Sequence, residues 1–196
     1  MIAYVLVIAA TVIALPAWAF AQKPLARLVL GAVVTVLTVL AALATAFEDS
    51  LVGDQHRVLV LFALALAICG GSVVTTAAFE AIDTVDQRRV AAIEQPVGAG
   101  VEPQADESMR AAGEVLRGGA WIGALERLAV FGTLAARWPE GVAVALAVKG
   151  LGRYPELRSG DNAGATERFI IGTLISMAWA ALCIYVAFAP YVVEAR

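Results

Sequence analysis

The side chains that could do chemistry are a few charges placed inside or beside long apolar runs. Glu126 and Arg127 are adjacent within the run 120–136. On a helix they would point about 100° apart, so each needs a partner elsewhere. An unpaired charge at the centre of a bilayer costs at least about 2.5–3.5 kcal/mol, so such charges usually pair and often mark a pathway. Glu126 is therefore the leading candidate for a titrating or cation-attracting group.

A helical hairpin that turns at Pro139 would bring further charges to the depth of Glu126. Glu126 lies 13 residues before Pro139 and Arg153 lies 14 residues after it. At 1.5 Å per residue the two would sit within about 2 Å of one depth. Lys149 and Arg153 are four residues apart and would share one helix face.

Glu167 and Arg168 open the last apolar run on the same side of the membrane, where Glu80 closes the third run. We therefore expect a polar network in the inner leaflet. It would be either a structural clasp between helices or a site of permeation or coupling. Its predicted members are Glu126, Arg127, Lys149, Arg153, Glu167 and Arg168.

Other chemical constellations are missing from the sequence. His56 is the single histidine, and the two cysteines, Cys69 and Cys183, fall in apolar runs and are interpreted as small core residues. The chain carries no phosphate-binding loop, nucleophile elbow or metal-ligand spacing. We expect neither an enzyme nor a bound metal or cofactor.

Small residues form two further features. Gly172, Ser176 and Ala180 make a small-xxx-small stripe, which lets helices approach closely. The stripe indicates packing within the chain or, alternatively, a subunit interface. The run 70–72, Gly-Gly-Ser, predicts either tight packing or a locally unwound site of the kind found in broken transporter helices.

The composition decides which elements must position these residues. Of the 196 residues, 61% are hydrophobic and 16% are charged, against a usual charged share of about 25%. A soluble core of this size could not bury so much apolar surface, so lipid must be part of the solvent. A net charge of −3 gives no basic footprint for nucleic acid.

The apolar runs predict an all-α, polytopic membrane protein with six spans. Four runs without charge are long enough to cross a bilayer, which needs about 20 residues: 1–22, 28–47, 58–79 and 169–193. The first lacks a positively charged start and exceeds a signal-peptide core, so we expect a retained helix. Residues 120–156 would form two short spans joined at Pro139 or a re-entrant hairpin.

The predicted organisation has three parts. Three transmembrane helices fill 1–82, an acidic cytoplasmic loop with a short amphipathic helix over 104–117 fills 83–118, and a helical transmembrane unit fills 119–196. With the N-terminus outside, ten of the 14 Lys and Arg residues fall on the inner side. This bias predicts a multi-pass protein of the bacterial inner membrane.

Three segments of the tail resemble a known family. They are WIGxLER at 121–127, KxxxRxxEL at 149–157 and ERFIIGTLxS at 167–176. Together they resemble the C-terminal part of the bacterial multi-pass membrane family called domain of unknown function 3307, over about residues 119–181. The resemblance implies a bacterial inner-membrane helical protein and places the shared charges in the network described above.

Two functions follow as expectations. The first is a small channel or transporter, oligomeric in the bilayer, with Glu126 on its path. The alternative is a non-catalytic accessory or scaffold subunit that docks a protein partner through 83–118. A cavity that reaches Glu126 would favour transport, whereas a fully paired Glu126 in a dry interior would favour a scaffold.

Overall fold

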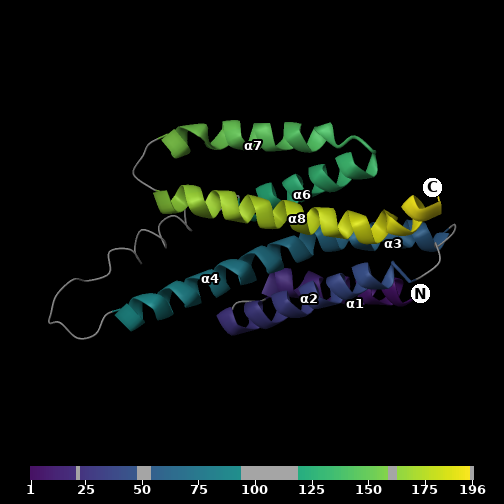
Figure 1. Ribbon diagram of the computed structural model, residues 1–196, viewed down its shortest axis with the longest axis horizontal. Helices are drawn as coiled ribbons and strands as arrows, with labels where there is room; N and C mark the ends of the chain where they lie inside the picture. Colours follow the sequence, from purple (N-terminus) through teal and green to yellow (C-terminus); the bar gives the residue numbers. More distant parts are fainter. Residues whose placement is uncertain (21–22, 48–53, 94–118, 159–162, 195–196) are drawn as a thin grey trace.

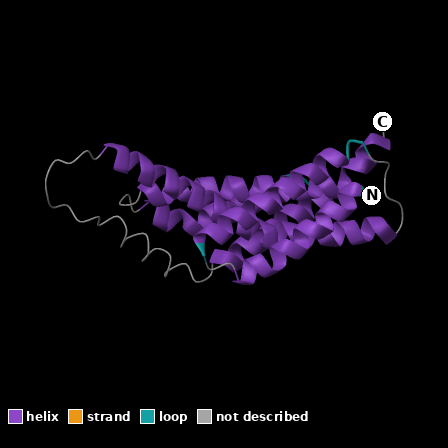
Figure 2. Cartoon of the chain, turned by 90° about the horizontal axis from the view of Figure 1, so that it is seen from below, coloured by secondary structure: helices purple, strands orange, loops and turns teal. Residues whose placement is uncertain are grey.

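The computed structural model is a bundle of α-helices (Figure 1). It describes residues 1–20, 23–47, 54–93, 119–158 and 163–194, and helices are the only regular elements among them (Figure 2). The predicted all-helical fold is confirmed over these ranges. The elements are α1 (Ile2–Phe20), α2 (Pro24–Ala44), α3 (Asp54–Ala65), the π-helical turn η1 (Leu66–Gly70), α4 (Gly71–Ile93), α6 (Gly119–Ala135), α7 (Glu140–Arg158) and α8 (Ala163–Glu194).

Three helical stretches are long and apolar enough to cross a membrane. They are Pro24–Ala44, Asp54–Val85, which runs from α3 through η1 into α4, and Thr166–Ala189 in α8. The stretch Ile2–Ala17 of α1 is apolar but shorter. These helices indicate a membrane location, as predicted, whereas the count of six spans stays a prediction.

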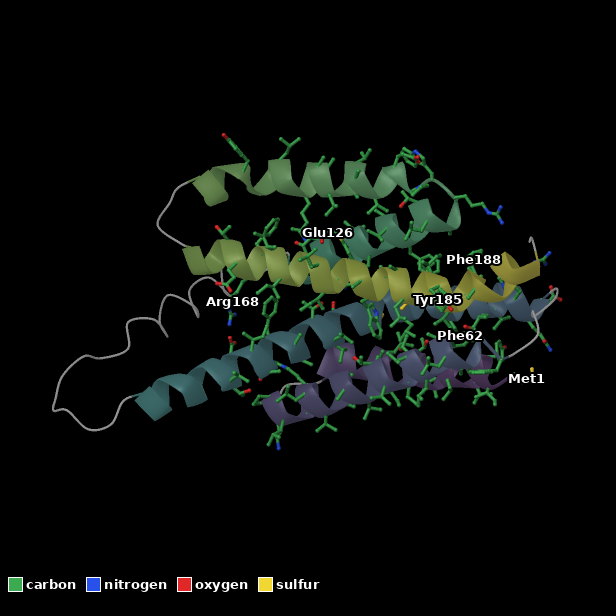
Figure 3. All side chains as sticks on the ribbon, in the orientation of Figure 1. Met1, Phe62, Glu126, Arg168, Tyr185 and Phe188 are labelled. Atoms are coloured by element: carbon green, nitrogen blue, oxygen red, sulfur yellow. The ribbon has the colours of Figure 1, made fainter. Side chains whose placement is uncertain are left out.

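The outer face of α2 is typical of a helix surrounded by lipid. Val29, Val36 and Leu43 are each more than half exposed, and they recur at helical spacing along one side. The opposite side of α2 is buried and consists of small or β-branched residues, Gly31, Val34, Thr38 and Ala41. Apolar side chains project outward along the other helices as well (Figure 3). Such a surface is stable only where lipid replaces water.

Small residues bring the helices close together in the core. The fully buried small residues come from two helices. They are Val7, Ala10 and Ala14 of α1 and Ala180 and Ala187 of α8. Thr11 Oγ1 lies 2.7 Å from Val7 O in its own helix and 3.2 Å from Phe62 O of α3. Its hydroxyl is therefore satisfied without water, as a membrane interior requires.

Helices α6 and α7 form the predicted helical hairpin, with its turn just before Pro139. The end of α6 is a Schellman motif, in which Trp138 N donates to Thr133 O at 2.9 Å and Arg137 N to Leu134 O at 3.0 Å. Arg137 takes the left-handed position, with φ 57°. This tight turn returns α7 against α6, so charges on the two helices can meet.

The end of α4 differs from the predicted domain boundary. A loop was expected from residue 83, but α4 continues to Ile93. Within the helix, the carboxylates of Glu80 and Asp83 have arginine partners on α2 and α8. The remainder of the predicted acidic loop, 94–118, including the expected amphipathic helix at 104–117, lies outside the described residues.

Helices α4 and α7 end, and α8 begins, toward one end of the bundle, whereas the N-terminus and the end of α8 lie at the opposite end (Figure 1). The two charged side chains labelled in Figure 3 lie toward the end at which α8 begins. Glu126 and Arg168 lie in that half of the bundle, away from Phe62 and Phe188 (Figure 3).

Candidate functional site: a charged cleft

A cleft of about 1090 Å³ lies among α4, α6, α7 and α8. Its walls are largely apolar, with residues such as Phe79, Leu125, Val148 and Phe169. The charged and hydroxyl side chains on its walls are Arg27, Ser72, Thr75, Thr76, Glu126, Arg127, Lys149, Arg168, Thr173 and Ser176. The structure thus gathers most of the predicted network on one cavity and adds hydroxyl groups from α4 and α8.

Glu126 pairs across the hairpin with Lys149. The Lys149 Nζ donates to Glu126 Oε2 at 2.5 Å, and the two side chains are only 18% and 19% exposed. The Lys149 ammonium also lies 5.2 Å from the ring centroid of Phe169, close enough for a cation–π attraction. The pair therefore links α6 to α7 and places the lysine against α8.

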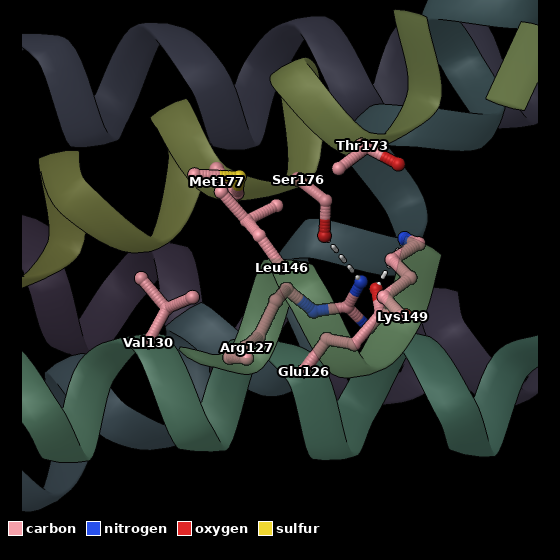
Figure 4. Close-up of a pocket in the computed structure, with 9 residues that line it drawn as sticks. Glu126, Arg127, Val130, Leu146, Lys149, Thr173, Ser176 and Met177 are labelled. Carbon is pink, nitrogen blue, oxygen red and sulfur yellow. Dashed lines mark hydrogen bonds and ion pairs between the residues drawn. The ribbon is translucent and has the colours of Figure 1, made fainter. Parts of the chain in front are cut away.

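The second oxygen of Glu126 is buried and unsatisfied. Oε1 has no hydrogen-bond partner among the described residues. Beside it lies a small cavity of about 20 Å³, lined also by Arg127, Lys149 and Ser176 (Figure 4). This volume is about that of one water molecule, and the lining offers several polar partners. The carboxylate is thus only half satisfied by the protein, which is unusual for a buried charge.

Arg127 reaches into the same small cavity as Glu126 but donates its hydrogen bonds to neutral groups (Figure 4). Its side chain is buried, with 4% exposure. Nη2 donates to Ser72 Oγ at 2.7 Å, Nη1 to Ser176 Oγ at 3.2 Å, and Nε to Ile68 O at 3.1 Å. No described carboxylate lies within ion-pair distance of it. The guanidinium therefore joins α6, η1, α4 and α8 without a described carboxylate in ion-pair contact.

The backbone around η1 makes room for this arginine. A Cβ on Gly71 would lie 2.6 Å from Arg127 Nε and 3.0 Å from Trp179 Cδ1, so a side chain there would collide with both. Trp179 is itself buried, and its Nε1 donates to Leu66 O at 3.1 Å. Carbonyls of η1 thus accept side-chain donors from α6 and α8. Single π-helical turns of this kind recur at functional sites.

Two further ion pairs border the cleft on α4. Arg27 of α2 donates to Glu80 at 3.0 Å. Arg168 of α8 pairs with Asp83, and its guanidinium carbon lies 5.3 Å from the ring centroid of Phe79. Both pairs are partly exposed, so they contribute less to stability than a buried pair would.

The predicted network therefore divides into separate contacts. Glu126 and Lys149 pair, Arg127 has hydroxyl and carbonyl partners, and Arg168 pairs with Asp83. Glu167 is exposed and does not join them. The backbone of Arg153 belongs to α7, but its side chain lies outside the described part of the chain.

The small-residue features have a clear place in the bundle. Ser176 and Ala180 are buried, and a Cβ on Gly172 would lie 3.0 Å from the ring of Phe79. All three therefore face inward, as the packing alternative predicted. At 70–72 the chain stays helical through η1 and α4, so tight packing rather than an unwound segment is found.

Sequence reasoning did not assign four residues to the charge network: Ser72, Phe79 and Phe169, which line the cleft, and Asp83, which pairs with Arg168. Asp83 was assigned to the loop because charged residues become frequent from this position onward. Its spacing of three from Glu80 was an available signal, since both would share one helix face. The aromatic contacts had no such signal, because they depend on which helices are neighbours.

Neither a metal site nor a similar protein adds to this description of the cleft. Within the described residues no cluster of three or more His, Cys, Asp or Glu side chains could hold a metal ion. No family model, curated protein or solved structure gives a significant match to the chain. The resemblance of residues 119–181 to a bacterial membrane family therefore stays a prediction.

Proposed function

We propose that this chain is a small transporter-like protein of the bacterial inner membrane, with its N-terminus outside, that binds a solute in the cleft. The observation that carries the proposal is the cleft itself, because its walls include Glu126, Lys149 and Arg127. A carboxylate sealed in a dry interior would have favoured a scaffold. A half-satisfied carboxylate on the wall of a large cavity favours a binding path.

The depth of the charges supports this reading. Ser72 lies 13 residues before the end of Asp54–Val85, and Ser176 lies 10 residues after the start of Thr166–Ala189. At 1.5 Å per residue both hydroxyls sit at least about 15 Å from the ends of these helices. Arg127 bonds to both, so it lies near the middle of an apolar layer about 30 Å thick. Ionisable groups at that depth usually serve a function.

The distribution of positive charge supports the orientation. Lys23 and Arg27 at the start of α2, and Arg168 at the start of α8, belong to the set that the positive-inside rule assigns to the cytoplasm. The alternative function, a scaffold that docks a partner through 83–118, rests on sequence alone, because 94–118 lies outside the described residues.

The test is flux through purified protein in liposomes. Wild type, Glu126→Gln and the control Glu140→Gln would be reconstituted at equal density, and proton, potassium and chloride flux measured by dyes and electrodes. Glu140 is exposed at the start of α7 and lies outside the cleft. We expect flux above that of empty liposomes for wild type and the control, and a changed rate for Glu126→Gln.

Two results would contradict the proposal. One is a folded wild-type protein, judged by circular dichroism and gel filtration, that gives no flux of any ion. The other is flux that Glu126→Gln leaves unchanged, because the cleft would then not be the path.

A further inference from the structure

The charges on the cleft wall do not balance. Four cations line it, Arg27, Arg127, Lys149 and Arg168. Three of them form ion pairs with Glu80, Glu126 and Asp83. Arg127 has no such partner among the described residues, so the wall carries an excess positive charge near the middle of the apolar layer.

Arg127 keeps hydrogen-bonding capacity beyond its three contacts. A guanidinium has five N–H groups, and described protein atoms engage one each on Nε, Nη1 and Nη2. The two remaining N–H groups belong to the two terminal nitrogens, and Arg127 lines the cleft. Guanidinium N–H groups suit a carboxylate or phosphate. On the same cleft wall, Thr75 Oγ1 is buried with no described partner and can donate as well.

The remaining walls suit a long apolar group. Ile122, Leu125 and Val148 line the cleft and are between 49% and 65% exposed. The volume of about 1090 Å³ is at the top of the range of about 300–1,000 Å³ for small-molecule sites. An inorganic anion would satisfy Arg127 but leave these apolar walls uncovered, whereas a chain-bearing molecule covers both.

From this combination we infer that the cleft binds an anionic amphiphile of the membrane, with its oxyanion head group at Arg127 and its apolar chain along α6 and α7. The inference deepens the proposed function and rests on it, since it names the class of solute for the same cleft. The remaining N–H groups and the charge of Arg127 select the head group. The apolar side chains of the two helices select the tail.

Binding can be tested apart from transport. Protein in an uncharged detergent would be titrated by native mass spectrometry with didecanoyl phosphatidylglycerol, with phosphatidylcholine of the same chains, and with inorganic phosphate. We expect the anionic lipid to bind at least about tenfold more tightly than the zwitterionic one, since a charged bidentate hydrogen bond contributes at least that much. Inorganic phosphate should not compete at similar concentrations.

Two pairs of variants locate the site. Arg127→Gln should abolish the preference for the anionic lipid, whereas Arg137→Gln, at an exposed turn outside the cleft, should keep it. Arg127 joins several helices, so an unfolded Arg127→Gln variant would give no information about binding. Val148→Trp therefore gives a second test by filling the cleft. Val144→Trp is its control, because Val144 is similarly exposed one turn earlier on α7 and does not line the cleft.

The outcomes separate this inference from the proposed function. Equal affinity for the two lipids, competition by inorganic phosphate, or preference retained in both Arg127→Gln and Val148→Trp would overturn the inference. Selective binding that depends on Arg127, in a protein without flux, would support it while contradicting transport. Flux that depends on Glu126, in a protein without lipid preference, would support transport and overturn the inference.

Discussion

The Glu126–Lys149 pair should behave as one energetic unit in the stability of the α6–α7 hairpin. Both side chains are mostly buried, and Nζ lies 2.5 Å from Oε2. Removing one partner leaves the other charge in an apolar setting, which costs about 3–5 kcal/mol for buried pairs. We therefore expect Glu126→Gln and Lys149→Met each to lower the free energy of unfolding by about 3 kcal/mol.

The double variant should recover most of that loss. With both charges gone, neither ion needs a partner, and replacing a buried pair by uncharged residues is often nearly neutral. We expect Glu126→Gln with Lys149→Met to lie within about 1 kcal/mol of wild type. The coupling energy between the two positions would then be several kcal/mol. Exposed ion pairs give only about 0.2–1 kcal/mol.

The assay is a double-mutant cycle, with unfolding in detergent followed by circular dichroism. Arg57→Gln is the matched control, because it removes the Arg57–Asp54 pair, whose side chains are 81% and 93% exposed. That variant should change the free energy of unfolding by less than about 0.5 kcal/mol. Additive losses in the cycle would refute the reasoning, because the two charges would then be solvated independently.

Three further predictions follow from single positions. Arg137→Gly should raise the unfolding temperature, with about 1 kcal/mol of stabilisation, because φ 57° strains a residue with a Cβ; no change would mean that the turn relaxes in solution. Gly71→Ala should destabilise by about 1–3 kcal/mol through overpacking, whereas Gly150→Ala, with nothing within 4 Å of its Cβ, should be neutral or stabilising in the same melt; equal effects would contradict the packing described. A spin label at Val36 should be relaxed by oxygen and not by a water-soluble nickel chelate, and one at Asp54 should show the opposite, because Val36 lies on the exposed face of α2; chelate access at Val36 would argue against a lipid-facing helix.

In the proposed function, Arg127 rather than Glu126 selects the solute. Both charges were predicted from sequence, and Glu126 was the expected pathway group because a lone carboxylate in an apolar run attracts cations. In the structure Lys149 neutralises Glu126, while hydroxyls and a carbonyl hold Arg127 without cancelling its charge. The proposed solute is therefore anionic.

The sequence by itself determined the class of fold and several local features. Long runs without charge required helices in lipid, because an unsatisfied backbone is too costly there. The three stretches that could cross a membrane accordingly lie in α2, in α3 through η1 into α4, and in α8. The hairpin at Pro139 followed from a polar break between two apolar runs, and adjacent Glu126 and Arg127 had to face different neighbours because of the helical angle.

Only the tertiary structure decided which partner each charge has. Depth along the hairpin placed Arg153 level with Glu126, and helical spacing placed Lys149 on the same face, but only the packing of α7 against α6 shows that Lys149 pairs with Glu126. Ser72, Ile68 and Ser176 meet at Arg127 because η1 shifts the backbone and Gly71 leaves space. Contacts between distant segments depend on how whole helices pack against one another. The periodicity within one segment does not predict that packing.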